Sequence, residues 1–177
     1  MDRFMPDRAR LVFSRYSCRR FTTDPVPAED RALLREALRW APSAGNAQPW
    51  RFYEVLRPEA KRALAAAALN QAFVAQAPVV YAVCADPGRA EKAYGERGRD
   101  LYVFQDTAAA VMNLLLAATD LGYGTCWVGA FHEGQAARVL GCGPGLRPVA
   151  LVPLGRPAEP DPGSTRRPLR EVLRVVE

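Results

Sequence analysis

The stretch "QDTAAAVMNLLLAATDLG", residues 105–122, decides the fold expected of this chain. Its apolar residues surround nearly the whole circumference of a helix over 105–121, and Gly122 is typical of the residue that ends a helix. A helix that is apolar on all sides is expected to be buried on most of them. In a chain of 177 residues, this predicts that a second subunit covers part of the helix.

Shorter helices and strands are expected on both sides of this helix. The spacing of apolar residues and the positions of Pro and Gly predict helices over 7–16, 27–41, 58–77 and 133–140, and strands over 51–56, 78–85, 125–131 and 147–155. Residues 86–104 are mixed and charged, and are expected to form a loop that runs into the start of the apolar helix. No repeat or internal boundary divides the chain.

The elements do not follow a regular β-α-β alternation, and no Gly-x-Gly-x-x-Gly motif joins a strand to a helix. The stretch "GCGPG" at 141–145 follows a helix and contains Pro, so it is interpreted as a turn. A nicotinamide cofactor would therefore not be held in a Rossmann-type site.

Composition excludes several classes of protein. The formal net charge is +5, but the arginines are spread along the chain among acidic residues, so no nucleic-acid partner is predicted. The four cysteines show no Cys-x-x-Cys spacing and the chain has one His, so no metal site is predicted. The polar N-terminus and the short apolar run 108–118, interrupted by Asn113, predict a cytoplasmic protein with no membrane partner.

The stretch "SRYSCRRF", residues 14–21, gathers positive charge around a hydroxyl. Arg15, Ser17 and Arg19 share one side of an extended segment, and Arg15 and Arg19 also meet on a helix. One guanidinium group can bind two phosphate oxygens at once through two parallel N–H donors. A phosphate site is one interpretation, and a solvated basic surface with carboxylate neighbours is the other.

The stretch "APSAGNAQPW", residues 41–50, combines small residues with two amides, Asn46 and Gln48. Small side chains let a flat ligand approach the backbone, and amides offer the donor and acceptor that a ring edge requires. A helix-to-strand loop whose amides satisfy local backbone groups is an equally good interpretation.

Five segments in this order resemble the nitroreductase family of FMN-dependent oxidoreductases. They are "SRYSCRRF…DPVP", "APSAGNAQPWRFYEV", "NQAFVAQAPVV", "LYVFQDTAAAVMNLLLAATDLGYGTCWVGAF" and "PVALVPLGRPAE…RRPLREVL". The resemblance extends from about residue 8 to the C-terminus, and five segments in order are far more specific than any one of them.

The resemblance implies an α+β fold, a three-layer sandwich in which helices flank a mainly antiparallel sheet. It also implies that residues 1–177 form one FMN-binding domain and that two chains form an intertwined homodimer through helix 105–121. The arm 156–177 would wrap around the partner subunit and add to its sheet. Two equivalent FMN sites would then lie at the subunit interface.

The resemblance also assigns roles to residues. Arg15, Ser17 and Arg19 would bind the FMN phosphate and ribityl end, joined by Arg166 or its close contender Arg167. A segment of the partner subunit would reach the flavin through Pro42, Ser43 and Asn46, with Gln48 binding or bracing it. Asn70 and Gln71 match the position that meets the pyrimidine edge, and the backbone of Gly129 and Ala130 would approach flavin N5, so no catalytic side chain is expected.

The function implied is transfer of hydride from NADH or NADPH to FMN, and then of electrons to a nitroaromatic, quinone or similar acceptor, in a ping-pong cycle. A specialised relative is the first alternative: a dehalogenase, a dehydrogenase or a flavin-fragmenting enzyme. A basic protein that has lost flavin and binds nucleic acid is the second. The segment between residues 86 and 105 is short compared with longer relatives, so we expect either a more open pocket or one closed only by the stretch "YGERGRDLY". Tyr94, Arg97 and Arg99 would then contact the nucleotide or acceptor, or form a solvated loop.

Overall fold

A computed structural model describes residues 10–177. The helices are α1 (Arg10–Ser14), α2 (Ala28–Arg39), α3 (Pro58–Ala67), α4 (Ala72–Gln76), α5 (Pro87–Arg97), α6 (Val103–Asp120), α7 (Glu133–Leu140) and α8 (Leu169–Val172). The strands are β1 (Trp50–Val55), β2 (Val79–Ala85), β3 (Gly124–Thr125) and β4 (Arg147–Gly155). Of the helix expected over 7–16, residues 7–9 lie outside the described part of the chain.

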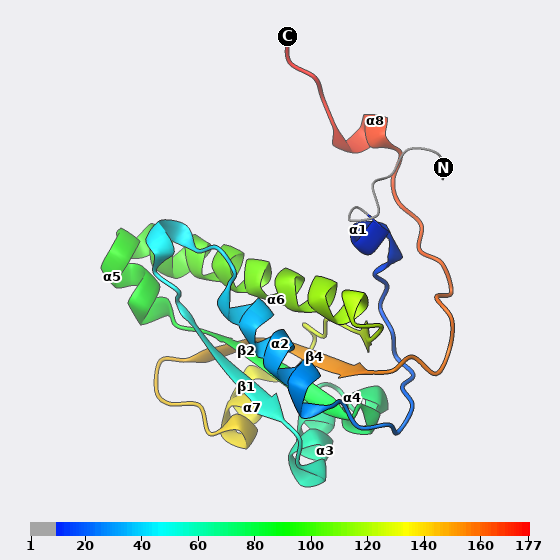
Figure 1. Cartoon of the computed structure of the whole chain (residues 1–177). Helices are drawn as coiled ribbons and strands as arrows, with labels where there is room; N and C mark the ends of the chain where they lie inside the picture. Colours follow the sequence, from blue (N-terminus) through cyan, green and yellow to red (C-terminus); the bar gives the residue numbers. More distant parts are fainter. Residues whose placement is uncertain (1–9) are drawn as a thin grey trace.

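The four strands form one sheet in the order β1-β2-β4-β3, and every neighbouring pair is antiparallel (Figure 1). The central strand β2 is buried along its whole length, in agreement with its unbroken run of apolar and β-branched residues. This arrangement confirms the predicted α+β class and the mainly antiparallel sheet.

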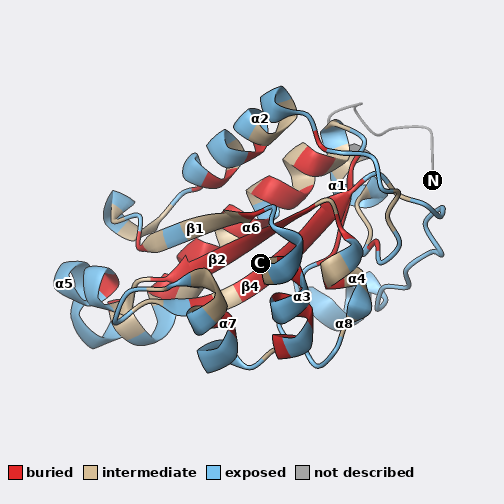
Figure 2. Ribbon diagram, turned by 90° about the horizontal axis from the view of Figure 1, so that it is seen from below, coloured by how far each residue is buried: buried red, intermediate tan, exposed pale blue. Residues whose placement is uncertain are grey.

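Helices cover both faces of the sheet, which confirms the three-layer sandwich. Val79, Tyr81 and Val83 of β2 pack with α2 and α6 on one face, while Val80 and Ala82 pack with α3, α4 and α7 on the other. Successive side chains of a strand point to opposite faces, so one strand supplies both cores. Figure 2 shows β2, β4 and the inner side of α6 as the buried centre.

Helix α6 is the long apolar helix that the sequence predicts, and it begins two residues earlier than expected. The continuous helical segment Pro87–Asp120 is long and apolar enough to cross a membrane, but 44% of its most apolar window is buried inside this fold. Val111, Leu114 and Ala118 lie in the core against the sheet. Helix α6 is thus a core helix of the sandwich.

The single helix expected over 58–77 is wrong, because the chain forms two helices, α3 and α4, with a break between them. At the break, Leu69 and Asn70 have φ values of 57° and 60°, in the left-handed region. A residue in that region ends an α-helix, and Asn tolerates it better than most. The break brings Asn70 and Gln71 to the surface.

The loop expected over 86–104 is also wrong, because most of it is helical. Asp86 caps α5 by accepting a hydrogen bond from the backbone N–H of Arg89 at 2.9 Å, and Pro87 occupies the first turn. A π-helical turn, Gly98–Tyr102, then joins α5 to α6. The Asp-Pro pair carries the signal, which the charged composition of the segment obscured.

The strand expected over 125–131 is shorter than predicted. Only Gly124–Thr125 forms a ladder with β4, and Val128 adds a single bridge to Leu151. Residues 129–131 leave the sheet, which places Gly129 and Ala130 on an exposed turn.

The tail leaves the sandwich after β4. Its last contacts with the body include the bridge between Phe21 and Pro157 and a hydrogen bond of 2.9 Å from the Ala158 N–H to the Arg20 carbonyl. Beyond this point every residue is exposed in the single chain, including α8, and the tail extends away from the sheet (Figure 1).

Candidate functional site

The segment that carries Arg15, Ser17 and Arg19 follows α1 and runs beside β3. Ser17 forms a parallel bridge with Thr125, and the Cys18 N–H donates to the Thr125 carbonyl at 2.8 Å. Cys18 is only 3% exposed, which confirms that it packs in the interior. Because residues alternate along this extended segment, Ser17 and Arg19 are exposed while Cys18 anchors them.

The guanidinium groups of Arg15 and Arg19 lie near one sulfur atom. Burial raises the pKa of the Cys126 thiol, and the positive charges of Arg19 and Arg15 oppose that rise. Within residues 10–177 no carboxylate pairs with either arginine, whereas Arg20 is bound to Glu159 at 2.5 Å. Two arginines without a carboxylate partner in this part of the chain, beside an exposed hydroxyl, are a donor set suited to a phosphate.

A shallow pocket of about 120 Å³ lies at this segment, between residues 16–20 and the start of the tail. Ligand cavities usually measure roughly 300–1,000 Å³, so this pocket is too small for a whole flavin nucleotide. The pocket is lined by Ser17 and Arg19, but also by Arg20 and the Glu159 carboxylate that pairs with it, and Arg15 lies outside the lining.

Gln71 and Ala130 form a second group of predicted site residues. The side-chain amide of Gln71 donates to the Ala68 carbonyl at 2.9 Å and to the Ala130 carbonyl at 3.2 Å, which holds the exposed turn after β3. A Cβ atom at Gly129 would have no neighbour within 4 Å, so the space above this turn is open. Within the described chain, neither Gly129 nor Ala130 donates a backbone hydrogen bond.

The third group is the loop from Pro42 to Gln48. Ser43 Oγ accepts a hydrogen bond from the Gln48 N–H at 2.9 Å, and the Gln48 side chain donates to Asn46 Oδ1 at 3.1 Å. Both amides therefore take part in local hydrogen bonds of the loop. Asn46 and Gln48 have φ values of 55° and 50°, so the loop depends on these contacts to hold a left-handed backbone.

Two contacts fix this loop to the helices behind it. The Ala44 N–H donates to Oδ1 of the buried Asp106 at 3.0 Å, and burial raises the pKa of that carboxyl while the hydrogen bond from Ala44 opposes the rise. Gly45 lies against the Tyr94 ring, where a Cβ atom would approach the hydroxyl to 2.3 Å. Asp106 was not predicted as a site residue, although a carboxylate in the first turn of an otherwise apolar helix is a visible signal.

In one chain the loop lies far from the other two groups. It contacts the first turn of α6, whereas the Arg15 segment and the Gln71 turn lie along the stretch that follows the last turn of α6. At 1.5 Å per residue, the 18 residues of α6 separate the two ends by roughly 27 Å. The fold of a single chain does not bring Ser43 and Asn46 to Arg15.

The remaining candidates lie on the surface. Arg166 donates only to the Thr165 carbonyl, and Arg167 pairs with Glu171 at 3.2 Å in the exposed tail, so neither meets Arg15 in this chain. On α5 and the π-helical turn, Arg99 is held by Glu91 and Asp100, each at 2.8 Å. Such an ionic cluster is the expected form of a solvated surface.

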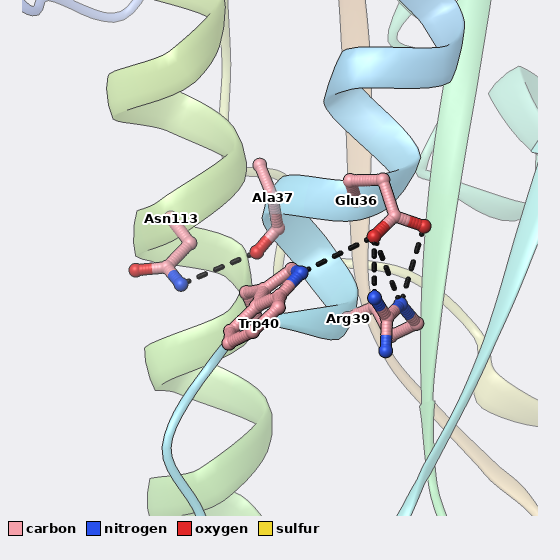
Figure 3. Close-up of polar contacts among 5 residues, drawn as sticks. All are labelled: Glu36, Ala37, Arg39, Trp40 and Asn113. Atoms are coloured by element: carbon pink, nitrogen blue, oxygen red, sulfur yellow. Dashed lines mark hydrogen bonds and ion pairs between the residues drawn. The ribbon is translucent and has the colours of Figure 1, made fainter.

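The end of α2 presents a large aromatic side chain to solvent (Figure 3). Trp40 is 71% exposed, donates to Glu36 at 3.2 Å, and lies 5.3 Å from the guanidinium of Arg39. Nearby, Asn113 of α6 donates to the Ala37 carbonyl at 3.2 Å and joins the two helices. A fixed, exposed Trp is typical of an interface.

Comparisons with known proteins identify the class. The sequence matches the model of the family described as Nitroreductase family over residues 12–72 and 64–156. It is 35% identical over 195 residues to the NADH dehydrogenase of Thermus thermophilus, covering 94% of this chain and 95% of that protein. It is 31% identical over 159 residues to a putative NADH dehydrogenase/NAD(P)H nitroreductase of Archaeoglobus fulgidus, covering 88% of each.

Solved structures agree with the sequence. The structure of B. megaterium NfrA2 superposes with a TM-score of 0.89 at 25% identity, covering 96% of this chain and 74% of that one. The fold and the matched segments together define an oxidoreductase. The chain belongs to the nitroreductase family, as its five segments predict.

Proposed function

We propose that this chain is an FMN-dependent oxidoreductase that takes hydride from NADH or NADPH and reduces nitroaromatic, quinone or similar acceptors in a ping-pong cycle. The observation that carries the proposal is that Arg15 and Arg19 flank the exposed Ser17 in a chain of the nitroreductase family, and that neither arginine pairs with a carboxylate among residues 10–177. This donor set fits the doubly charged phosphate that distinguishes FMN from riboflavin.

Different residues would bind different parts of FMN. Arg15, Ser17 and Arg19 hold the phosphate, and Asn70 and Gln71 lie where an amide can meet the edge of the isoalloxazine ring. The N–H groups of Gly129 and Ala130 donate no backbone hydrogen bond within residues 10–177 and would be available to donate toward N5. FMN, when bound, supplies the chemistry by accepting a hydride and passing two electrons on. Cationic and N–H donors near the ring favour its anionic reduced form.

The separation of the loop from the phosphate group supports a homodimer. Two copies of α6 that pack antiparallel about a two-fold axis would place the first turn of one against the last turn of the other. Pro42, Ser43 and Asn46 of one subunit would then reach the flavin held by Arg15 of the other. Exposed apolar residues in or directly after α1, α2 and α6 support this dimer, because an interface would cover them: Val12, Leu33, Trp40 and Met112.

The tail fits a role in the same dimer. Among residues 10–177, strand β1 is an edge of the sheet with no neighbour on its outer side, and cavities of about 330 and 300 Å³ flank it on its two faces. The tail carries exposed apolar residues at Leu169, Val172 and Leu173. We propose that residues 156–177 of one subunit wrap the other and add to its sheet, which also brings Arg166 or Arg167 toward a flavin phosphate.

The test is a visible spectrum of the purified protein after incubation with FMN, recorded before and after anaerobic addition of NADH and of NADPH. A protein-bound flavin band that either nucleotide bleaches, followed by recovery of the band with a quinone, supports the proposal. A band that neither nucleotide bleaches would contradict hydride transfer from NAD(P)H and favour a dehalogenase, dehydrogenase or flavin-fragmenting reaction. Failure to retain FMN would contradict the flavin site itself.

A further inference from the structure

Two thiols lie in contact at the end of the sheet far from the phosphate-binding segment. Cys84 is the penultimate residue of β2 and Cys142 lies in the turn after α7, 58 residues further along the chain. Their Sγ atoms are 3.6 Å apart, in hydrogen-bonding contact. A disulfide needs about 2.05 Å, so one sulfur must approach the other by roughly 1.5 Å.

The backbone on both sides can supply that movement. Strand pairing is irregular at Cys84, because the register of β2 and β4 shifts between Val83 and Cys84. Cys142 lies in the stretch "GCGPG", where Gly141 and Gly145 have φ values of 64° and 86°. A turn with three glycines moves at little cost, whereas the centre of the sheet does not.

The two sulfurs differ in access. Cys84 is fully buried. Its burial is the main cause that raises the pKa of its thiol well above the usual value, and the nearby Cys142 adds to this rise. Cys142 is half-buried in the exposed turn, close to the Tyr53 side chain. An oxidant from solvent therefore reaches Cys142 first, and Cys84 is placed behind it as the second thiol.

We propose that Cys84 and Cys142 form a reversible disulfide when the protein meets hydrogen peroxide. The Cys142 thiolate attacks one peroxide oxygen, the O–O bond breaks, and a sulfenic acid and one water are produced. The Cys84 sulfur then attacks the Cys142 sulfur, the S–O bond breaks, and a second water leaves with the thiol proton. Two thiols lose two electrons in total and one peroxide molecule gains them.

The bond would join the end of β2 to the turn between α7 and β4. These segments lie at the same end of the sheet, because β2 and β4 are antiparallel neighbours (Figure 1). Closing a loop of this length restricts the unfolded chain, so the oxidised protein is expected to melt about 5–15 °C above the reduced protein. The proposal does not depend on the flavin chemistry.

The experiment treats purified wild-type protein with hydrogen peroxide, blocks the remaining thiols under denaturing conditions, and maps the peptides without reduction. The expected result is a loss of two of the four free thiols, a Cys84–Cys142 cross-linked peptide, and return of both thiols with dithiothreitol. Cys18 and Cys126, which are also buried near one another, should remain free and serve as the internal control.

The matched variant is Cys142→Ser, which changes a partly exposed residue and leaves Cys84 in place. It should fold like the reduced wild type, keep Cys84 as a free thiol, and show no peroxide-dependent rise in melting temperature. Cys84→Ala is the reciprocal variant, in which Cys142 should stop at the sulfenic or a higher acid. A wild-type protein whose Cys142 is oxidised without cross-linking, or whose cross-link joins other cysteines or two chains, would overturn the proposal.

Discussion

The backbone N–H of Ala44 donates a 3.0 Å hydrogen bond to the buried carboxylate of Asp106, 62 residues further along the chain. The contact joins the loop proposed to touch the flavin to the first turn of α6, the helix proposed to form the dimer. In the proposed dimer, this one contact would fix both the flavin-facing loop and the interface helix.

Asp106→Asn is expected to change how stability depends on pH. Burial raises the folded-state pKa of Asp106 above its ordinary 3.8, so the folded chain holds the proton more tightly than the unfolded chain. Its contribution to the free energy of unfolding is complete below 3.8 and is lost as pH rises through the folded pKa. The amide of Asn keeps an acceptor for Ala44 but does not titrate.

Urea denaturation of both proteins across about pH 3–7 measures this effect. The free energy of unfolding of wild type minus variant should fall as pH rises above the ordinary value and then become constant. Other acidic groups are common to both proteins and cancel in the difference. A difference that rises with pH would contradict the assignment.

Arg19→Ala is expected to weaken FMN retention by about 1.5–3 kcal/mol, the usual contribution of a charge-assisted hydrogen bond, or roughly 10- to 150-fold in Kd. Arg20→Ala removes the same charge from the neighbouring residue, which is already bound to Glu159. Fluorescence titration of apoprotein with FMN compares the two. Equal losses of affinity would show that only the general positive charge matters and that Arg19 makes no direct contact.

Gly124→Ala is expected to destabilise the fold by about 1–3 kcal/mol through overpacking. The added Cβ would lie 2.6 Å from Cys18 Cβ and 3.1 Å from a Pro157 carbon, so it would push the Arg15–Arg19 segment off β3. Gly143→Ala is the matched control, because its Cβ meets nothing within 4 Å. Urea denaturation under reducing conditions measures the free energy of unfolding of both variants, and FMN affinity is measured on the same proteins. A Gly124→Ala protein as stable as wild type would show that the Arg15–Arg19 segment packs elsewhere.

Deletion of residues 158–177 is expected to weaken the dimer and leave the sandwich folded. No residue beyond Gly155 is buried in the chain, so the core does not need the tail. Light scattering coupled to size exclusion, over a range of concentrations, should show dissociation of the truncated protein at concentrations where the full chain is dimeric. Circular dichroism checks that the fold survives. A truncated protein that dimerises as tightly as the full chain would contradict a wrapping arm.

Local patterns predicted most of the elements correctly. Helix 105–121 and strand 78–85 followed from unbroken apolar runs, and strand 147–155 matched β4 residue for residue. The wrong predictions of helices and loops lie where the backbone conformation or capping of one or two residues outweighs the pattern of the whole segment. Asn70 and Leu69 split the third helix through their left-handed backbone, and the cap at Asp86 turned a charged segment into helix.

The sequence by itself determined the family and the helix that must be buried, and it predicts which residues would bind a phosphate, because these depend on side-chain identity and short-range spacing. Only the tertiary structure decided which of the predicted site residues lie close together. Arg15, Ser17 and Arg19 lie beside β3 because the Ser17 bridge aligns their segment with that strand, and the Ser43 loop lies apart because α6 holds the two ends separate. Contacts between residues distant in the chain depend on how packed elements fit together, and that information is not contained in any one segment.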